Sequence, residues 1–534
     1  MLRKGRMSGA AALVAGLLLG GCVGEARPVE GAAGTGGGAG GAGADGGGGT
    51  AGTSGGGGTA GTAASDGGTG GGGFGGSVNA PVVCAEDADC PGDRPHCNPL
   101  GACSACDEAT CDGALLWSKA WPGGMAPWAL ASAGDRVALG GMLASPIDFG
   151  GGALAVEGEG GGAYYAELGA DAAHRVSRVL PSTDHAILER IELGAAGERL
   201  LFGTYFGDVA IAGETLVESS RLTSGSQFVA LAGADGAVRF ALASDTLANR
   251  FVTATLASDG DVLLSGLLNP GKSLELGGLR ITNDWPNSSP WTARLRPDGT
   301  ARWLKALEEV ARLVATPDGG FVVSGDGAAG TIPEGTGEGS SYNLHVARYD
   351  ANGTRQWART YPGPGANALK AFDNHALAAA PDGSIAFSAA CFGELPMGEG
   401  AVLRPAEFDE LCLVQLDADG RYAAGTTLPY GFRVAGLAID PWGRVVAGGD
   451  TLAADPRFGL EEPPAANTPW IAAFERDGSL SSARSFAADG VAGVTAFTLD
   501  ASGEPLLGGS FTGALDIGGL ASDVPSIWLA RIAP

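Results

Sequence analysis

One motif recurs seven times between residues 133 and 509, and this repetition limits the possible fold more than any other feature. Each copy has a small glycine turn before a short apolar strand, as in AGDRVALGG, AGERLLFGT, DGDVLLSG and DGGFVVSG. The turn glycines lie at steps of 63, 63, 59, 64, 60 and 60 residues, and they are Gly134, Gly197, Gly260, Gly319, Gly383, Gly443 and Gly503. Such a period indicates stacked units, none of which buries its apolar face alone.

A second motif lies between these turns and reads as strand, Asp-Gly or Asn-Gly turn, strand. Examples are TARLRPDGTARWLKAL around Gly299, VARYDANGTRQWART around Gly353 and AAFERDGSLSSARSF around Gly478. Apolar alternation with short glycine turns is typical of antiparallel hairpins, because glycine readily adopts positive φ. Each unit therefore holds about four strands, which is the size of a propeller blade. The expected fold class is all-β, a seven-bladed β-propeller.

The two ends of the repeat region indicate how this ring closes. The seventh unit stops at its third strand, Ile527–Arg531, and the missing fourth strand matches residues 112–119, which lie upstream of the first unit. We therefore expect residues 112–534 to form the propeller, with the N-terminal strand completing the last blade and removing open sheet edges. An open β-solenoid and a string of small sandwiches are the alternatives.

Residues 1–21 read as a bacterial export signal. Arg3, Lys4 and Arg6 precede the apolar run Ala10–Leu19, which is too short to span a bilayer. No later stretch has eighteen consecutive apolar residues, so the sequence predicts no transmembrane helix.

The signal ends in Leu19-Gly20-Gly21-Cys22, which resembles a bacterial lipobox. The resemblance implies cleavage before Cys22 and its acylation, and several acyl chains give firm anchoring. It also implies that Val23 favours the outer membrane, since Asp at this place favours inner-membrane retention. We expect an exported protein, lipid-anchored to the outer membrane on its periplasmic side or at the cell surface. The alternative is an ordinary signal peptide followed by an incidental cysteine.

Two further segments precede the propeller. Residues 22–83 are almost all Gly, Ala, Ser and Thr, and such a composition predicts a disordered tether. Residues 84–111 hold six cysteines, which in an exported chain indicate a small disulfide-rich module. The sequence alone does not determine which of these cysteines pair with one another. The alternative is zinc, because Cys103 and Cys106 have ligand-type spacing. The six cysteines are Cys84, Cys90, Cys97, Cys103, Cys106 and Cys111.

The units resemble the SBBP-type β-propeller repeat of bacterial secreted and surface proteins. The resemblance rests on a double-glycine motif at Ile147–Gly151, Leu276–Gly278 and Leu515–Gly519, together with the turn-Trp spacing. Blades five and six lack both features. The resemblance implies a fold and a surface location but no shared chemistry.

Composition excludes several functions. The formal net charge is −26, which argues against nucleic acid as a partner, because binding phosphates needs clustered positive charge. The sequence has no HExxH or Ser-His-Asp pattern, and only five His. We expect no metal site, no cofactor and no catalytic residues, and we expect a monomer.

The candidate contact residues are exposed aromatics of the variable b–c loops, since variable loops on a rigid scaffold usually carry binding. They are Trp285, Tyr342, Phe408 and Phe458, for which loop packing is the alternative. Three tryptophans at Gly-x-x-x-Trp spacing, Trp117, Trp303 and Trp357, are expected to pack between blades. Cys391 and Cys412 fall on neighbouring strands, where a disulfide competes with two buried thiols.

These observations favour a membrane-anchored lipoprotein whose propeller is a non-catalytic binding or scaffold module for an unknown protein or glycan. The alternative is a polysaccharide lyase or glycosidase with its site at the propeller channel. An enzyme should gather carboxylates, His or Tyr at the channel mouth, whereas a scaffold should line it with small residues. The innermost strands, such as residues 311–315 and 494–498, suggest little ionisable chemistry there.

Overall fold

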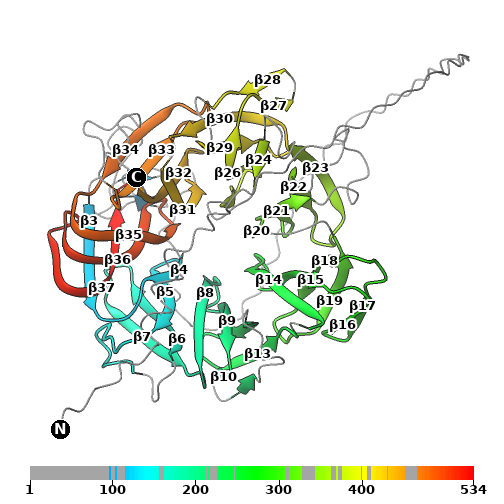
Figure 1. Ribbon diagram of the computed structural model, residues 1–534, viewed down its shortest axis with the longest axis horizontal. Helices are drawn as coiled ribbons and strands as arrows, with labels where there is room; N and C mark the ends of the chain where they lie inside the picture. The colour runs from blue at the N-terminus through cyan, green and yellow to red at the C-terminus, as the bar shows by residue number, and fades with distance from the viewer. Residues whose placement is uncertain are drawn as a thin grey trace, which may run out of the picture. The chain divides into compact units, whose positions relative to one another are not determined.

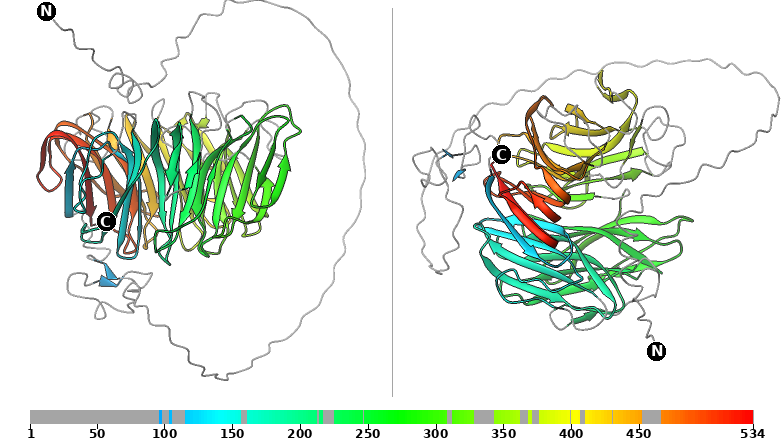
Figure 2. Two further views of the ribbon diagram at one scale, coloured as in Figure 1. Left: turned by 90° about the horizontal axis from the view of Figure 1, so that it is seen from below. Right: turned by 60° about the vertical axis from the view of Figure 1, so that its left-hand side comes forward.

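A computed structural model describes residues 96–97, 103–104 and 115–533. Within the last range it does not describe residues 156–160, 212–213, 217–224, 246, 308–311, 328–342, 362–367, 371–375, 399, 406–409, 430 and 452–465. Within residues 115–533 the described strands include seven sheets of four or five strands arranged around one central axis (Figure 1), and Figure 2 shows the ring from two further directions. This all-β, seven-bladed propeller confirms the predicted fold class. The described residues contain no helix of the length and apolarity needed to cross a membrane.

Each blade runs from an innermost strand a to an outermost strand d. Blade 1 comprises β4 (Pro127–Ala133), β5 (Arg136–Leu143), β6 (Gly162–Gly169) and β7 (His174–Leu180). Blade 2 comprises β8 (His185–Leu193), β9 (Arg199–Phe206), β12 (Ser226–Ala232) and β13 (Val238–Ala243), and blade 3 comprises β14 (Asn249–Leu256), β15 (Val262–Leu268), β18 (Ser289–Leu295) and β19 (Ala301–Ala306). Blade 4 comprises β20 (Arg312–Ala315), β21 (Phe321–Gly327), β22 (Asn343–Tyr349) and β23 (Arg355–Tyr361).

Blade 5 differs in its inner strand, which is present as two segments that both pair with strand b. Blade 5 comprises β24 (Ala368–Lys370), β25 (Leu377–Ala379), β26 (Ile385–Phe392), β29 (Glu410–Leu416) and β30 (Tyr422–Leu428). Blade 6 comprises β31 (Phe432–Ile439), β32 (Val445–Thr451), β33 (Pro469–Phe474) and β34 (Leu480–Ser485). Blade 7 comprises β35 (Ala488–Leu499), β36 (Pro505–Leu515), β37 (Leu520–Ile532) and β3 (Leu115–Pro122).

Blade 7 is completed by the strand that precedes blade 1 in the sequence. β3 pairs antiparallel with β37, which places Trp117 opposite Arg531 and Trp121 opposite Ile527 (Figure 1). Trp121 and Ile527 are buried in the same apolar cluster. The predicted closure is therefore confirmed, and the outer edge of β37 is covered by pairing.

Short hairpins occupy several of the connections between strands b and c that sequence analysis treated as loops. They are β10 (Val209–Ile211) with β11 (Glu214–Leu216), β16 (Ser273–Leu276) with β17 (Leu279–Thr282), and β27 (Leu395–Gly398) with β28 (Ala401–Leu403). The blade 3 hairpin packs against its outer strand, because the Gly277 carbonyl accepts a hydrogen bond of 2.9 Å from the Ala301 amide. A Cβ at Gly277 would lie 2.3 Å from that same nitrogen, so no side chain fits at the first glycine of the double-glycine motif Leu276–Gly278.

A glycine within strand b ends most copies of the repeated DGDVLLSG-type motif. In blade 7 it is Gly509, which lies directly opposite Trp528 of strand c. A Cβ here would lie 1.8 Å from the carbonyl oxygen of Gly493 and 2.8 Å from Nε1 of Trp528. The glycine thus leaves room for a close backbone on one side and a large aromatic ring on the other.

We expect Gly509→Ala to lower the free energy of unfolding by about 2–3 kcal/mol, because the added methyl overpacks a site closed by backbone. The neighbouring Gly508→Ala is a matched control, since its Cβ would meet nothing closer than 3.4 Å. Urea unfolding of the two variants measures the difference. Equal losses for both substitutions would contradict the steric explanation.

Candidate functional site

The innermost strands enclose a channel of about 530 Å³ that contains the candidate site. Its wall is formed by residues from β4, β8, β14, β20, β25, β31 and β35, so all seven blades contribute. This volume lies within the range of roughly 300–1,000 Å³ that small-molecule sites occupy.

Among the described parts of the inner strands, five contain a β-bulge at corresponding positions, and the extra residue of each lies in the channel wall. In blade 2 the pairing passes from Leu188–Gly203 to Arg190–Phe202, which leaves Glu189 without a partner in strand b. A bulge re-aims the side chain of its extra residue. The extra residues are Trp128, Glu189, Val252, Ala435 and Thr495.

Arginines provide most of the charge in this wall. Arg190, Arg312 and Arg433 line the channel, and Glu189 is the only carboxylate among the described lining residues. The expectation that the inner strands carry little ionisable chemistry was therefore wrong. It rested on residues 311–315 and 494–498, whereas most of the charged side chains lie on other blades.

Two of these arginines are fixed by partners from the blades themselves. Arg433 forms a bidentate pair with Asp450 in strand b of its own blade. Arg190 donates from Nη1 to the carbonyl oxygens of Ala254 and Leu313, at 3.0 and 3.2 Å, and lies 3.5 Å from Glu192. Arg190 therefore links the inner strands of blades 2, 3 and 4.

Glu189 has an unusual electrostatic environment for an exposed side chain. The side chain is accessible from the channel, but protein surrounds it closely, and this desolvation raises its pKa above the ordinary value of a glutamate. A hydrogen bond from Thr204 and the positive charges of Arg250 and Arg312 act in the opposite direction on the pKa.

Trp285 is the one predicted contact aromatic within the described residues, and it is 66% exposed. Its amide donates to Oδ1 of the buried Asn283, whose Nδ2 donates to the carbonyl oxygens of Leu268 and Asn287. A buried side chain thus holds an ordered loop that presents Trp285 to solvent. Tyr342, Phe408 and Phe458 lie outside the described residues.

The three turn-spaced tryptophans lie between blades, as predicted. Each indole donates to a carbonyl oxygen in the c–d turn of the next blade: Trp117 to Ala170, Trp303 to Ala351 and Trp357 to Ala418, at 2.9 to 3.0 Å. The role of these three residues is structural.

We expect Trp303→Phe to lower the free energy of unfolding by about 1 kcal/mol, because it removes one inter-blade hydrogen bond while keeping an aromatic ring. Trp285→Phe is the control, since Trp285 is mostly exposed. Thermal melts of the two variants distinguish them, and an unchanged melt for Trp303→Phe would contradict the linking role.

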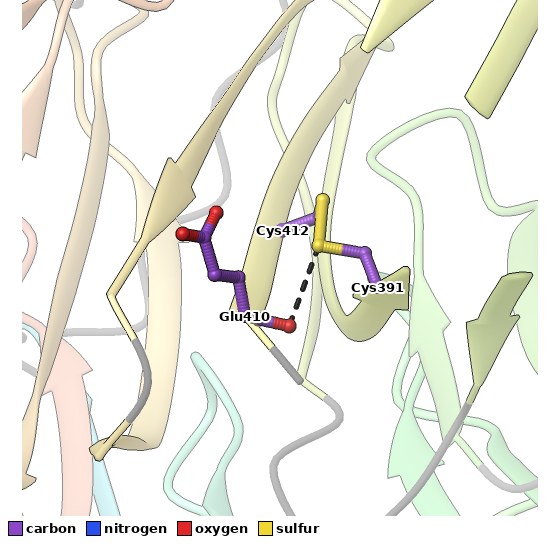
Figure 3. The surroundings of a disulfide bond; sticks show 3 residues. All are labelled: Cys391, Glu410 and Cys412. Carbon is purple, nitrogen blue, oxygen red and sulfur yellow. Dashed lines mark hydrogen bonds between the residues drawn. A yellow bond between two sulfur atoms is a disulfide. The ribbon is translucent and has the colours of Figure 1, made fainter. Parts of the chain in front are cut away.

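Cys391 and Cys412 are joined by a disulfide between strands b and c of blade 5, with 5.7 Å between their Cα atoms (Figure 3). Both side chains are fully buried, and Sγ of Cys391 lies 3.3 Å from the carbonyl oxygen of Glu410. Cys412 lies opposite Ala389 in blade 5, at the position where Trp528 lies opposite Gly509 in blade 7. The disulfide therefore takes the place of an aromatic ring, and Ala takes the place of the glycine.

Most other predicted sites lie outside the described residues, including Cys22, Cys84, Cys90, Cys106 and Cys111. Cys97 and Cys103 are directly opposite each other in a two-stranded sheet of β1 (His96–Cys97) and β2 (Cys103–Ser104). The disulfide pairing of this module stays a prediction.

The sequence matches no protein-family model and no curated protein. Solved structures similar to the chain include a polysaccharide lyase, Uly1 (9% identity, 77% of this chain and 90% of that chain, TM-score 0.42). Others are Sqt1 from Chaetomium thermophilum (10%, 79% and 99%, TM-score 0.38) and a catalytically inactive virginiamycin B lyase from Staphylococcus aureus with quinupristin (10%, 77% and 98%, TM-score 0.37). Similarities this distant say nothing about function.

Proposed function

We propose that this chain is an exported lipoprotein whose SBBP-type propeller binds its ligand without transforming it. The lipobox at Leu19–Cys22 supports anchoring to the outer membrane, and the Gly-rich residues 22–83 supply the tether between lipid and propeller. The ligand is a protein or a glycan, and the propeller acts as a monomer.

The observation that carries the binding role is the composition of the channel wall. Trp128 and Phe497 supply aromatic surface, and the arginines supply polar contacts. A concave site with aromatic surface and a few placed polar groups is typical of ligand binding. The closed ring holds these side chains on strands rather than on loops, which favours a preformed site.

The test of binding uses the full mature chain with Cys22→Ala, which stays unacylated. We expect it to bind one or more ligands on a glycan array and to turn over no substrate in a hydrolase and lyase panel. Substantial turnover of any polysaccharide would overturn the proposal.

The test of anchoring uses expression in a Gram-negative host with labelled palmitate. The native chain should incorporate label and fractionate with the outer membrane, whereas Cys22→Ala should do neither. Val23→Asp is the matched control, because it should retain the label but move to the inner membrane. Label in the Cys22→Ala variant would show that another residue is acylated.

A glycosidase or lyase is the second candidate, and Glu189 favours it. A channel carboxyl group with a raised pKa suits a general acid. Glycosidases normally need a second carboxylate roughly 5–10 Å away, and the described wall residues supply only Glu189. Glu189→Gln should abolish any turnover that the substrate panel detects.

A further inference from the structure

Residues 283–288 of blade 3, which we call the Trp285 loop, hold the most exposed large apolar side chain of the described propeller. The exposed fraction of Trp285 is 66%, whereas Trp291, Trp470 and Trp528 are fully buried. The loop lies between the β16–β17 hairpin and β18. Because an indole is large, rigid and apolar, it contributes more to binding than most other side chains when it is free to contact a ligand.

The backbone of the Trp285 loop is held in place before any ligand arrives. Asn283 is 1% exposed, and its amide group accepts one hydrogen bond from within the loop and donates two, to the loop and to the end of β15. Pro286 fixes its own φ and restricts the backbone of Trp285 before it. A ligand that contacts Trp285 therefore has little backbone ordering to offset.

The Trp285 loop forms one surface with the neighbouring connection from blade 2 to blade 3. Asn269 links them, because its Nδ2 donates to the carbonyl oxygen of Leu247 at 3.3 Å and its Oδ1 accepts from Ser288 Oγ at 3.2 Å. This surface lies where strand b ends and strand c begins. The N-terminal strand enters the ring at the opposite end, since Leu115 pairs with Ile532, the last residue of a strand c.

The apolar part of this surface is small. Among the described residues, the other exposed large apolar side chain on it is Leu247, which is 55% exposed. Leu279 lies at the hairpin tip, beside the c–d turn, and the remaining ones lie on blades 5 to 7. These remaining residues are Leu116, Val402, Leu480, Val491 and Val524. Protein interfaces need a cluster of apolar side chains that neighbours shield from water, so a lone indole favours a ligand about the size of one ring.

Polar side chains surround the indole. Asp284, Asn287 and Ser288 of the same loop are all exposed. A carboxylate accepts hydrogen bonds, and an amide both donates and accepts them, so together they satisfy hydroxyl groups. A hexopyranose ring has C–H bonds on one face and hydroxyl groups around its edge. The C–H bonds are attracted to the negative face of an indole, and the hydroxyl groups match the polar side chains.

Charge favours a neutral sugar over an acidic one. The exposed side chains of Lys272 and Asp284 contribute one charge of each sign near the loop, and Asp245 adds a negative charge on the neighbouring connection. The net charge of the whole chain is −26, so its long-range field repels anions.

We propose that the Trp285 loop binds a neutral hexose unit of a glycan. The indole of Trp285 stacks on the C–H face of the sugar, and Asp284 and Asn287 bind its hydroxyl groups. This inference rests on the proposed binding role, and it adds a site outside the channel together with the ligand class of that site.

The test uses the full mature chain with Cys22→Ala on an array of neutral and acidic glycans that includes cello-, malto-, laminari- and mannohexaose. We expect at least one neutral hexose glycan to bind, and calorimetry then measures its affinity. Trp285→Ala should weaken this affinity about tenfold or more, and Trp285→Phe should weaken it less because a smaller ring remains. Binding to acidic glycans alone, or to none, would overturn the proposal.

Leu279→Ala is the matched control, because Leu279 is an exposed apolar residue of the same blade at the other end of the hairpin. It should leave the affinity unchanged. The melting temperature of Trp285→Ala should equal that of the native chain, since the side chain is mostly exposed. Equal affinities of the native chain and Trp285→Ala would contradict the assignment.

Fluorescence gives a readout that a purely structural role of Trp285 would not produce. Acrylamide quenches exposed indoles, so saturation with the glycan should reduce quenching in the native chain. The Trp285→Phe variant should show no such reduction at saturation. Unchanged quenching in the native chain would exclude stacking on Trp285.

The outcomes separate this site from the proposed binding role. A glycan that binds the native chain and Trp285→Ala equally would refute the loop site and leave the binding role intact. Turnover of the bound glycan would refute the non-catalytic role and leave the site intact. Self-association in sedimentation that Trp285→Ala abolishes would make the loop a contact between copies of the chain, and it would overturn the proposal.

Discussion

A chain that begins at Gly123 is expected to melt well below one that begins at Asp112, and to aggregate. The shorter chain lacks β3, so β37 becomes an open edge able to pair with other molecules. It also loses the buried Trp121, whose removal alone should cost about 3–5 kcal/mol. Scanning calorimetry and light scattering measure the two effects.

The chain from Asp112 on is itself the control for truncation. It lacks everything before the propeller but keeps β3 complete, so its melting temperature should equal that of the full mature chain. Equal stability of the two truncated chains would show that the ring does not depend on closure by β3.

Replacing Cys391 and Cys412 together by Ala should lower the free energy of unfolding by about 3 kcal/mol. The bond joins residues separated by 21 positions, and a crosslink of that span limits the unfolded ensemble by about this amount. The loss should be greater if blade 5 fails to pack around the smaller side chains, because no aromatic ring occupies this position there.

Reductant provides the matching experiment. Both cysteines are fully buried, so dithiothreitol should leave the folded protein unchanged but lower the midpoint of urea unfolding. The double Ala variant should have the same midpoint with and without dithiothreitol. A reductant effect of equal size in that variant would assign the effect to cysteines other than Cys391 and Cys412.

The sequence predicted the ring well because each element of the prediction rests on local chemistry. Asp-Gly turns such as Asp298-Gly299 need a positive φ, and Gly299 has a φ of 83°. The unmatched last unit required a strand from elsewhere, and the Gly-x-x-x-Trp motif of β3 identified it. The inter-blade role of Trp303 and the pairing of Cys391 with Cys412 followed from the same alignment of units.

The channel could not be predicted in the same way, because β-bulges decide which side chains face it. A bulge inserts one residue without changing the apolar pattern around it, so Glu189 reads as an ordinary strand residue. Strand b does contain a sequence signal for the bulge at Glu189. Gly203 lies opposite the residue before Glu189, and a Cβ there would lie 2.1 Å from the carbonyl oxygen of Ile187. The b–c hairpins were missed for a related reason, since their strands are only three or four residues long.

The pairing of Leu115 with Ile532 also determines how late in synthesis the ring can close. Its two partners are almost the first and the last residues of the propeller, so β3 has no native partner until β37 has been synthesised. A protein that leaves the cytoplasm amino end first would expose β3 and the unclosed ring throughout transit. Contacts of such long range form slowly, because the entropy of closing the chain is lost before any pairing is gained. If the chain is exported as proposed, periplasmic chaperones that shield strands should therefore affect its yield more than that of propellers closed within a single blade.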